Sequence, residues 1–174
     1  MNGNTPRLLA LLSAIVAAAA LRLAPHPPNF TPIGAMALFS AAYLGRRPIA
    51  FAAPLGALLL SDLLLGFYHG IVTVYASVAL IVVVGWLALS RISPLRVGAA
   101  ALASSVLFFA ITNFGVWLFT GFYPLTWAGL SACYVAAIPF FQNTVAGDLF
   151  YSVLLFGGFA LLERTLPMLR PRAA

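Results

Sequence analysis

Long apolar stretches separated by short polar junctions run along the whole chain. Apolar residues make up 63% of the sequence, and charged residues only 7%. Apolar runs of about 17 to 25 residues have the length that an α-helix needs to cross roughly 30 Å of hydrocarbon. The pattern therefore predicts an all-α integral membrane protein with a single transmembrane domain.

Six stretches are predicted to form the helices of a six-transmembrane-helix bundle. We place them at residues 7–23, 31–45, 48–67, 70–90, 97–119 and 143–162. The first run also has features of a cleaved signal peptide. Arg22 directly after that run is a poor start for an exported chain, so we expect a retained helix.

The second predicted helix, residues 31–45, is unusually short. Thr31 is suited to the N-cap position and Pro32 to the first helical position. Such a helix reaches only about 22 Å, so its outer end is expected to lie below the membrane surface. The preceding loop must then follow it into the membrane, and the four prolines of "RLAPHPPNFTP" fix its path and remove amide donors.

Residues 125–141 are also apolar and are a candidate for a seventh helix. Pro124 and Pro139 bracket this stretch, and Gln142 and Asn143 follow it directly. A seventh span would also move the C-terminal arginines to the outer side. We therefore predict a re-entrant or interfacial segment before the last helix.

The distribution of arginines predicts the orientation of the bundle. All nine basic residues are arginines; with six spans, eight fall on the side of the termini and only Arg22 on the other. Because cytoplasmic loops are enriched in positive charge, we expect cytoplasmic termini and a location in the bacterial inner membrane. The net charge of +6 does not indicate nucleic-acid binding, since the arginines form no continuous basic face.

Polar and aromatic side chains are predicted to gather in the outer half of the bundle. Asp62 and Asp148 fall at similar outer depths on antiparallel spans, and ionisable groups inside a membrane usually mark a functional site. The side chains expected to bind a small-molecule ligand there are Arg22, His26, Asn29, Asp62, His69, Asn113, Trp117, Tyr123, Trp127, Asn143, Asp148 and Tyr151. Structural alternatives remain: the aromatic residues suit an interfacial belt, and Arg22 could pair with Asp62.

Two further features concern small residues. Ala10, Ala14 and Ala18 repeat at every fourth position, which suits close approach of a partner helix or of a helix within the bundle. The single cysteine, Cys133, excludes an intrachain disulfide and is expected to be a buried thiol. No metal site and no cofactor are predicted.

The chain resembles a bacterial membrane family of unknown function whose members are described as candidate transport proteins. The segments that carry this resemblance are "HPPNFTPIGAMALFSAAYLG", "PLGALLLSDLLLGFY", "FFAITNFGVWLFTGFYPLTWAGL" and "CYVAAIPFFQNTVAGDLFYSVLLFG". Together they cover nearly the whole chain, and the resemblance implies no particular substrate.

At a looser level the layout is similar to the substrate-binding S components of energy-coupling-factor (ECF) vitamin transporters. That resemblance implies an outward-facing site covered by the loops after helices one, three and five, here residues 22–30, 67–70 and 120–142. It also implies coupling and ATPase subunits as partners, with the coupling subunit docked on Ala10, Ala14 and Ala18.

The expected function is therefore that of a small-molecule, vitamin-like transporter or its substrate-binding subunit. No GxxxxGK[ST] loop is present, so any use of ATP would require partner subunits. One alternative is a membrane-embedded enzyme that uses Asp62 or Asp148 with His26 or His69, although HExxH and GxSxG motifs are absent. The other is a structural or assembly subunit.

Overall fold

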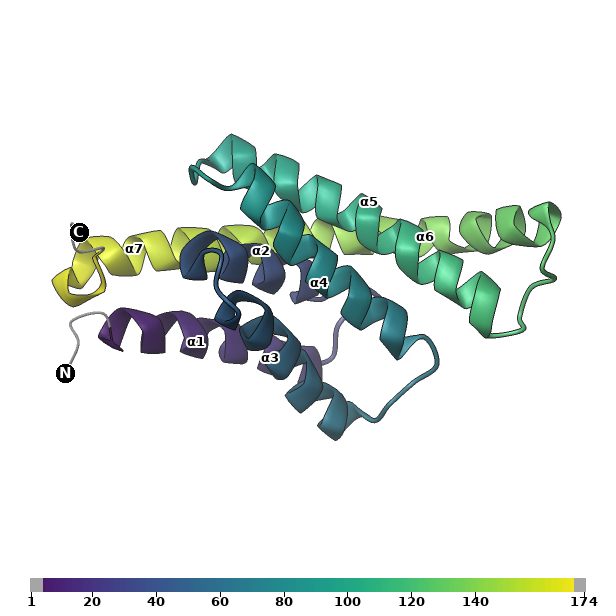
Figure 1. The fold of residues 1–174 in the computed structure, drawn as a ribbon, viewed down its shortest axis with the longest axis horizontal. Helices are drawn as coiled ribbons and strands as arrows, with labels where there is room; N and C mark the ends of the chain where they lie inside the picture. Colours follow the sequence, from purple (N-terminus) through teal and green to yellow (C-terminus); the bar gives the residue numbers. More distant parts are fainter. Residues whose placement is uncertain (1–4, 171–174) are drawn as a thin grey trace.

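The computed structural model describes residues 5–170, which form an all-helical bundle (Figure 1). Its helices are α1 (Thr5–Ala20), α2 (Ile33–Leu44), α3 (Ile49–Leu65), α4 (Ile71–Ala88), α5 (Pro94–Phe119), α6 (Trp127–Ser152) and α7 (Gly158–Thr165). Short 3-10 turns follow α1 at Leu21–Leu23 and α7 at Pro167–Leu169. The start of α1 and the end of α7 lie at one end of the bundle, and the loops 66–70 and 120–126 lie at the other, which we call the loop end.

Helix α2 lies at the centre of the bundle. Ten of its 12 residues are buried, and it packs against α1, α3, α4, α5 and α6. A helix that is apolar on all sides is suited to such a position. The short second helix is therefore present, but it is shorter than the predicted 31–45. Thr31 is not its N-cap: the cap position is Pro32, which makes no side-chain capping hydrogen bond.

The end of the chain corrects one prediction. Helix α6, a π-helical turn at Val153–Gly157 and α7 form one uninterrupted helical run from Trp127 to Thr165. The predicted re-entrant or interfacial segment at 125–141 is therefore wrong, and the last helix does not begin at residue 143. Thr126 caps the run by accepting a hydrogen bond from the Gly129 amide at 3.1 Å. Pro139 lies inside the helix, because neighbouring helices can support the backbone that a proline leaves unbonded.

The surface of the bundle suits a lipid environment. Within residues 5–170, four stretches are long and apolar enough to cross a membrane: Thr5–Leu23, Ile71–Ala88, Pro94–Phe119 and Trp127–Thr165. Helices α2 and α3 are apolar but shorter. Large apolar side chains point outward, among them Leu64, Val72 and Leu95, which are 74%, 77% and 84% exposed. In water such an apolar surface would favour aggregation, whereas lipid tails cover it without cost.

Gly85 allows α4 to lie directly against α2. A Cβ atom at this position would lie only 2.5 Å from the Cβ atom of Ala41 and 3.5 Å from the Cα atom of Leu38. By contrast, a Cβ atom on Gly98 in α5 would meet nothing within 4 Å. The two glycines therefore form a matched pair of helical positions, one crowded and one open.

We predict that Gly85→Ala lowers the free energy of unfolding by about 1–3 kcal/mol, because α2 and α4 must move apart. Gly98→Ala should be neutral or stabilising by up to about 1 kcal/mol, since alanine is the better helix former. Thermal unfolding of both variants in detergent measures the difference. Equal melting temperatures would contradict close packing of α2 against α4.

Candidate functional site

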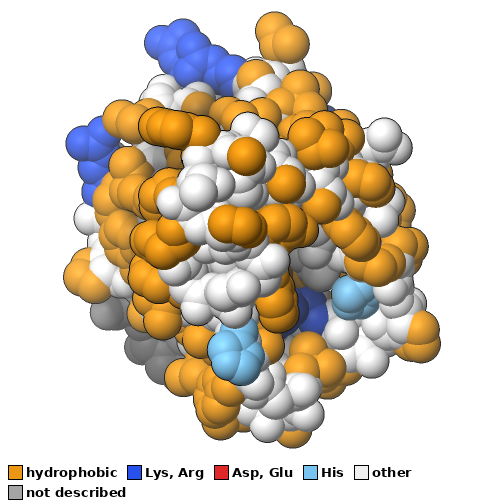
Figure 2. All heavy atoms as spheres, turned by 90° about the vertical axis from the view of Figure 1, so that its right-hand side faces the viewer, with side chains coloured by type: hydrophobic (Ala, Val, Ile, Leu, Met, Phe, Trp, Pro, Cys, Tyr) orange, Lys and Arg blue, Asp and Glu red, His pale blue; other side chains and the backbone are white. Residues whose placement is uncertain are grey.

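A cavity of about 380 Å³ opens at the loop end of the bundle. Figure 2 shows the hollow in this end, with an arginine side chain inside it and the two histidines beside it. Its volume is at the small end of the range of roughly 300–1,000 Å³ that is typical of ligand sites. It is lined by Arg22, His26, Asn29, Thr31, Ile33, Gly34, Tyr68, His69, Gly70, Thr73, Val74, Phe108, Thr112, Asn113, Val116, Thr144 and Asp148.

The shortness of α2 accounts for the position of this cavity. At 12 residues, α2 is only about 18 Å long. Its first residues, Ile33 and Gly34, form the floor of the cavity. Helices α4, α5 and α6 extend further toward the loop end and supply walls of the cavity. The loop before α2 supplies His26 and Asn29. Asn29 adopts a left-handed conformation with φ of 64°, which asparagine tolerates better than most residues and which turns the loop toward α2.

One wall of the cavity contains a buried ion pair. The Nη1 atom of Arg22 lies 2.8 Å from Oδ1 of Asp62 and also donates a hydrogen bond to the hydroxyl of Ser61. The hydroxyl of Tyr75 donates to the other Asp62 oxygen at 3.0 Å. Asp62 is fully buried and lies behind Arg22, outside the lining of the cavity. The pairing of Arg22 with Asp62, one of the alternatives from the sequence, is confirmed.

Tyr68 lies in the loop between α3 and α4 and adds a phenol to the same part of the cavity. Burial is the main cause that raises the pKa of Tyr68, and the Asp62 carboxylate raises it further. The nearby Arg22 cation lowers the pKa. The net effect is upward, so the phenol stays protonated at neutral pH. Tyr68 can therefore both donate and accept a hydrogen bond at the cavity wall.

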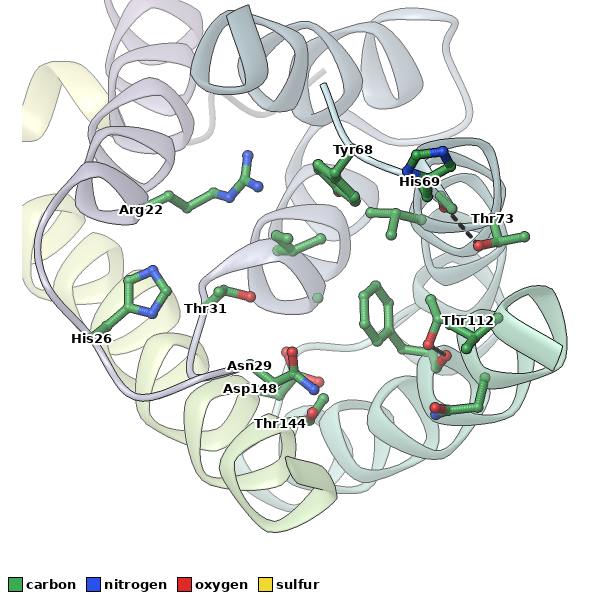
Figure 3. A pocket seen from close by; sticks show the side chains of 17 residues that line it. Arg22, His26, Asn29, Thr31, Tyr68, His69, Thr73, Thr112, Thr144 and Asp148 are labelled. Atoms are coloured by element: carbon green, nitrogen blue, oxygen red, sulfur yellow. Dashed lines mark hydrogen bonds between the residues drawn. The ribbon is translucent and has the colours of Figure 1, made fainter. Parts of the chain in front are cut away.

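Asp148 lies on the opposite side of the cavity from Arg22 (Figure 3). Its side chain, 4% exposed, accepts a hydrogen bond from the Ser105 hydroxyl at 2.6 Å and another from the Gly34 amide. A Cβ atom on residue 34 would overlap the carboxylate, so glycine is needed there for α2 to begin against α6. A carboxylate from α6 thus occupies the N-terminus of α2, where the free amides and the helix dipole favour negative charge.

Four threonines line the cavity as well, and three of them have engaged hydroxyls. Each donates its hydrogen to a backbone carbonyl of its own helix or loop: Thr73 to Gly70 at 2.7 Å, Thr112 to Phe108 at 2.7 Å, and Thr144 to Phe140 at 3.2 Å. A hydroxyl whose hydrogen is engaged in this way still has oxygen lone pairs free to accept. These three side chains therefore present hydrogen-bond acceptors rather than donors.

The structure brings half of the predicted ligand-binding residues together. Those that line the cavity are Arg22, His26, Asn29, His69, Asn113 and Asp148. They come from the 3-10 turn Leu21–Leu23, the loops 24–32 and 66–70, α5 and α6, and so lie together at one end of the bundle.

The other predicted residues hold the surrounding loops or face away. Tyr151 is buried and packs against Phe30 at 5.6 Å between ring centroids. Asn143 donates a hydrogen bond to the Pro28 carbonyl at 2.9 Å, and Trp117 donates to the Pro124 carbonyl at 2.9 Å. Tyr123 lies half-buried in the loop 120–126, and Trp127 is 85% exposed. None of these five side chains lines the cavity.

The sequence interpretation passed over one side of the cavity. Phe108, Thr112 and Val116 all line it from α5, and their spacing of four places them on one face of the helix. Because α5 is apolar almost throughout, this face does not differ from its neighbours in composition. The available signal was Thr112, a polar residue of the same apolar segment directly before the predicted site residue Asn113.

The alanine stripe of α1 faces the interior. Ala18 is buried, while Ala10 and Ala14 are half-buried against the apolar core. Packing within the bundle accounts for this placement, and docking of a partner helix on the stripe stays a prediction. Cys133 is buried as expected, with its sulfur 3.4 Å from the Asn113 carbonyl. Within residues 5–170, no group of three or more His, Cys, Asp or Glu side chains is arranged to hold a metal ion.

Comparison with known proteins shows the family of this chain. A family of unknown function, DUF6580, matches residues 2–169, so the chain belongs to that family. No curated protein and no solved structure matches it.

The Arg22–Asp62 pair generates a prediction about stability. Asp62→Asn leaves a buried guanidinium without its counterion, which should lower the free energy of unfolding by about 3–5 kcal/mol. Adding Arg22→Met to that variant should recover most of the loss, because no unpaired charge then remains. Thermal unfolding in detergent measures both changes.

Glu163→Gln serves as the control for loss of one carboxylate. Glu163 pairs with Arg7 at the opposite end of the bundle, and both side chains are partly exposed, so the cost should be only about 0–1 kcal/mol. A double variant no more stable than Asp62→Asn alone would contradict the assigned pairing.

Proposed function

We propose that this member of the DUF6580 family is a membrane protein that binds a small polar solute in the cavity at its loop end, as a transporter or as the substrate-binding subunit of one. The observation that carries the proposal is the cavity itself. In a chain with only 7% charged residues, it gathers an arginine, an aspartate, two histidines and several hydroxyl and amide groups around one space.

The cost of this arrangement supports a role in binding. A charged group at membrane depth costs a few kcal/mol, so such groups are retained where they pair with one another or meet a solute. A structural role alone would favour a filled interior, since protein interiors are close-packed and each void forfeits contacts. An open polar space of about 380 Å³ is therefore better explained by a solute that enters it.

The proposal includes the orientation of the bundle in the membrane, with the cavity facing outward. Apart from Arg22, the described arginines lie in two kinds of place. Some lie near the two chain ends, at the start of α1 and in or after α7. The others lie in or beside the junctions 45–48 and 89–93. Those segments are expected to be cytoplasmic, which turns the cavity toward the outside. With this orientation we further propose an arrangement like that of an ECF S component, with ATP-driven partner subunits on the cytoplasmic side.

Native mass spectrometry of the gently purified protein tests the proposed binding. We expect a small molecule to co-purify with the wild-type chain and to be lost from Thr112→Phe, because the added ring occupies the cavity. Thr165→Phe is the matched control: Thr165 is exposed in α7 and also donates its hydroxyl to the carbonyl four residues earlier. Equal occupancy in both variants, or no bound solute in the wild-type protein, would count against the proposal.

Cysteine labelling tests the orientation. In a Cys133→Ala background, a membrane-impermeant maleimide should label Phe122→Cys in intact spheroplasts but Ser90→Cys only after lysis. Residue 122 lies in the loop 120–126 and residue 90 in the junction 89–93, and both side chains are exposed. The reverse pattern would place the cavity on the cytoplasmic side.

A further inference from the structure

The two charged side chains of the cavity differ in whether an opposite charge lies beside them. Arg22 is paired with the fully buried Asp62 at 2.8 Å, so this pair contributes no net charge. Asp148, 4% exposed, is hydrogen-bonded only by the neutral donors Ser105 and Gly34. Among the salt bridges of residues 5–170, none involves Asp148. The cavity therefore contains one carboxylate that has no cation beside it.

The N-terminus of α2 supports a negative charge on Asp148. Its free amides and dipole stabilise an anion by a modest amount, and the two hydrogen bonds add to this. They do not replace a counterion: the cost of burying a carboxylate charge is removed either by a bound proton or by a paired cation. A positively charged group inside the cavity would complete the balance.

The groups around Asp148 are suited to the same kind of ligand. Figure 3 places Thr144 beside Asp148, and Thr112 faces the same space from α5. Both hydroxyls have donated their hydrogens to backbone carbonyls, so they offer acceptors. An ammonium group has donors but no acceptor, and the aromatic lining residues Phe108 and Tyr68 can stabilise a cation through their ring faces.

We propose that the solute is a small organic cation, such as a protonated amine, whose charged nitrogen pairs with the Asp148 carboxylate and hydrogen-bonds to the threonine oxygens. This inference rests on the proposed solute-binding function of the cavity. An anion is disfavoured, because Asp62 already neutralises the charge of Arg22 while the negative charge of Asp148 would repel it.

Three probes of nearly the same shape and different charge test the inference. Benzylamine is a cation at neutral pH, benzyl alcohol is neutral and benzoate is an anion. Each is titrated against the full-length protein in nanodiscs, with thermal stability and calorimetry as readouts. We expect saturable stabilisation by benzylamine alone, and binding at least about tenfold weaker in Asp148→Asn, the loss expected for a charge-assisted hydrogen bond.

Control variants separate local from general effects. Glu163→Gln also removes one carboxylate, but at the opposite end of the bundle, and should bind benzylamine as the wild-type protein does. Thr144→Val keeps the shape of the side chain and removes the acceptor, so a smaller weakening, of a few-fold, is expected. The comparison of the three probes on wild-type protein stands even if Asp148→Asn fails to fold.

The outcomes separate the two proposals. Saturable binding of benzoate or benzyl alcohol that Thr112→Phe abolishes would keep the solute-binding function and overturn the assignment of a cation. Unchanged benzylamine binding in Asp148→Asn would also overturn it. Absence of binding by every probe, together with absence of a co-purified solute, would overturn both.

Discussion

The arrangement of this protein depends on a short buried helix that begins inside the bundle. The first amides of any helix lack partners within that helix, and those of α2 begin at the base of the cavity. Asp148 of α6 accepts from the Gly34 amide there, and the absence of a side chain at Gly34 allows the carboxylate to approach. The chain above this point is loop rather than helix, and the space that α2 leaves is the cavity.

The two aspartates within the helices have different surroundings. Asp62 faces Arg22 and Tyr75, and its negative charge is matched within the protein. Asp148 faces only neutral donors and borders the cavity. A buried ion pair can be understood as part of the fold, because each partner removes the cost of burying the other. Asp148 receives the amide at the start of α2, but no salt bridge within residues 5–170 matches its charge, and the proposed cation site therefore lies at Asp148.

The loop before α2 is held in place at several points by residues of α6. Asn143 donates to the Pro28 carbonyl, and the ring of Tyr151 packs against Phe30. Gly147 lets α6 lie against the same segment, since a Cβ atom there would be 3.0 Å from the Thr31 amide nitrogen. Irregular backbone at membrane depth needs protein around it, and these contacts supply it. Polar residues outside the cavity lining thus determine where His26 and Asn29 lie.

Hydrophobic length and residue spacing are local properties of the chain, and they predict the helical class, the short second helix and the end of the bundle at which polar groups gather. They do not predict the last helix: Pro139 resembles a boundary, yet in the structure it lies inside a helix that packs against α5. Beyond the alternative that Arg22 pairs with Asp62, they do not distinguish the two aspartates, since both lie in apolar segments. Tertiary structure decided that Asp62 meets Arg22 and that Asp148 meets the start of α2, because pairing depends on distances between helices that no local pattern records.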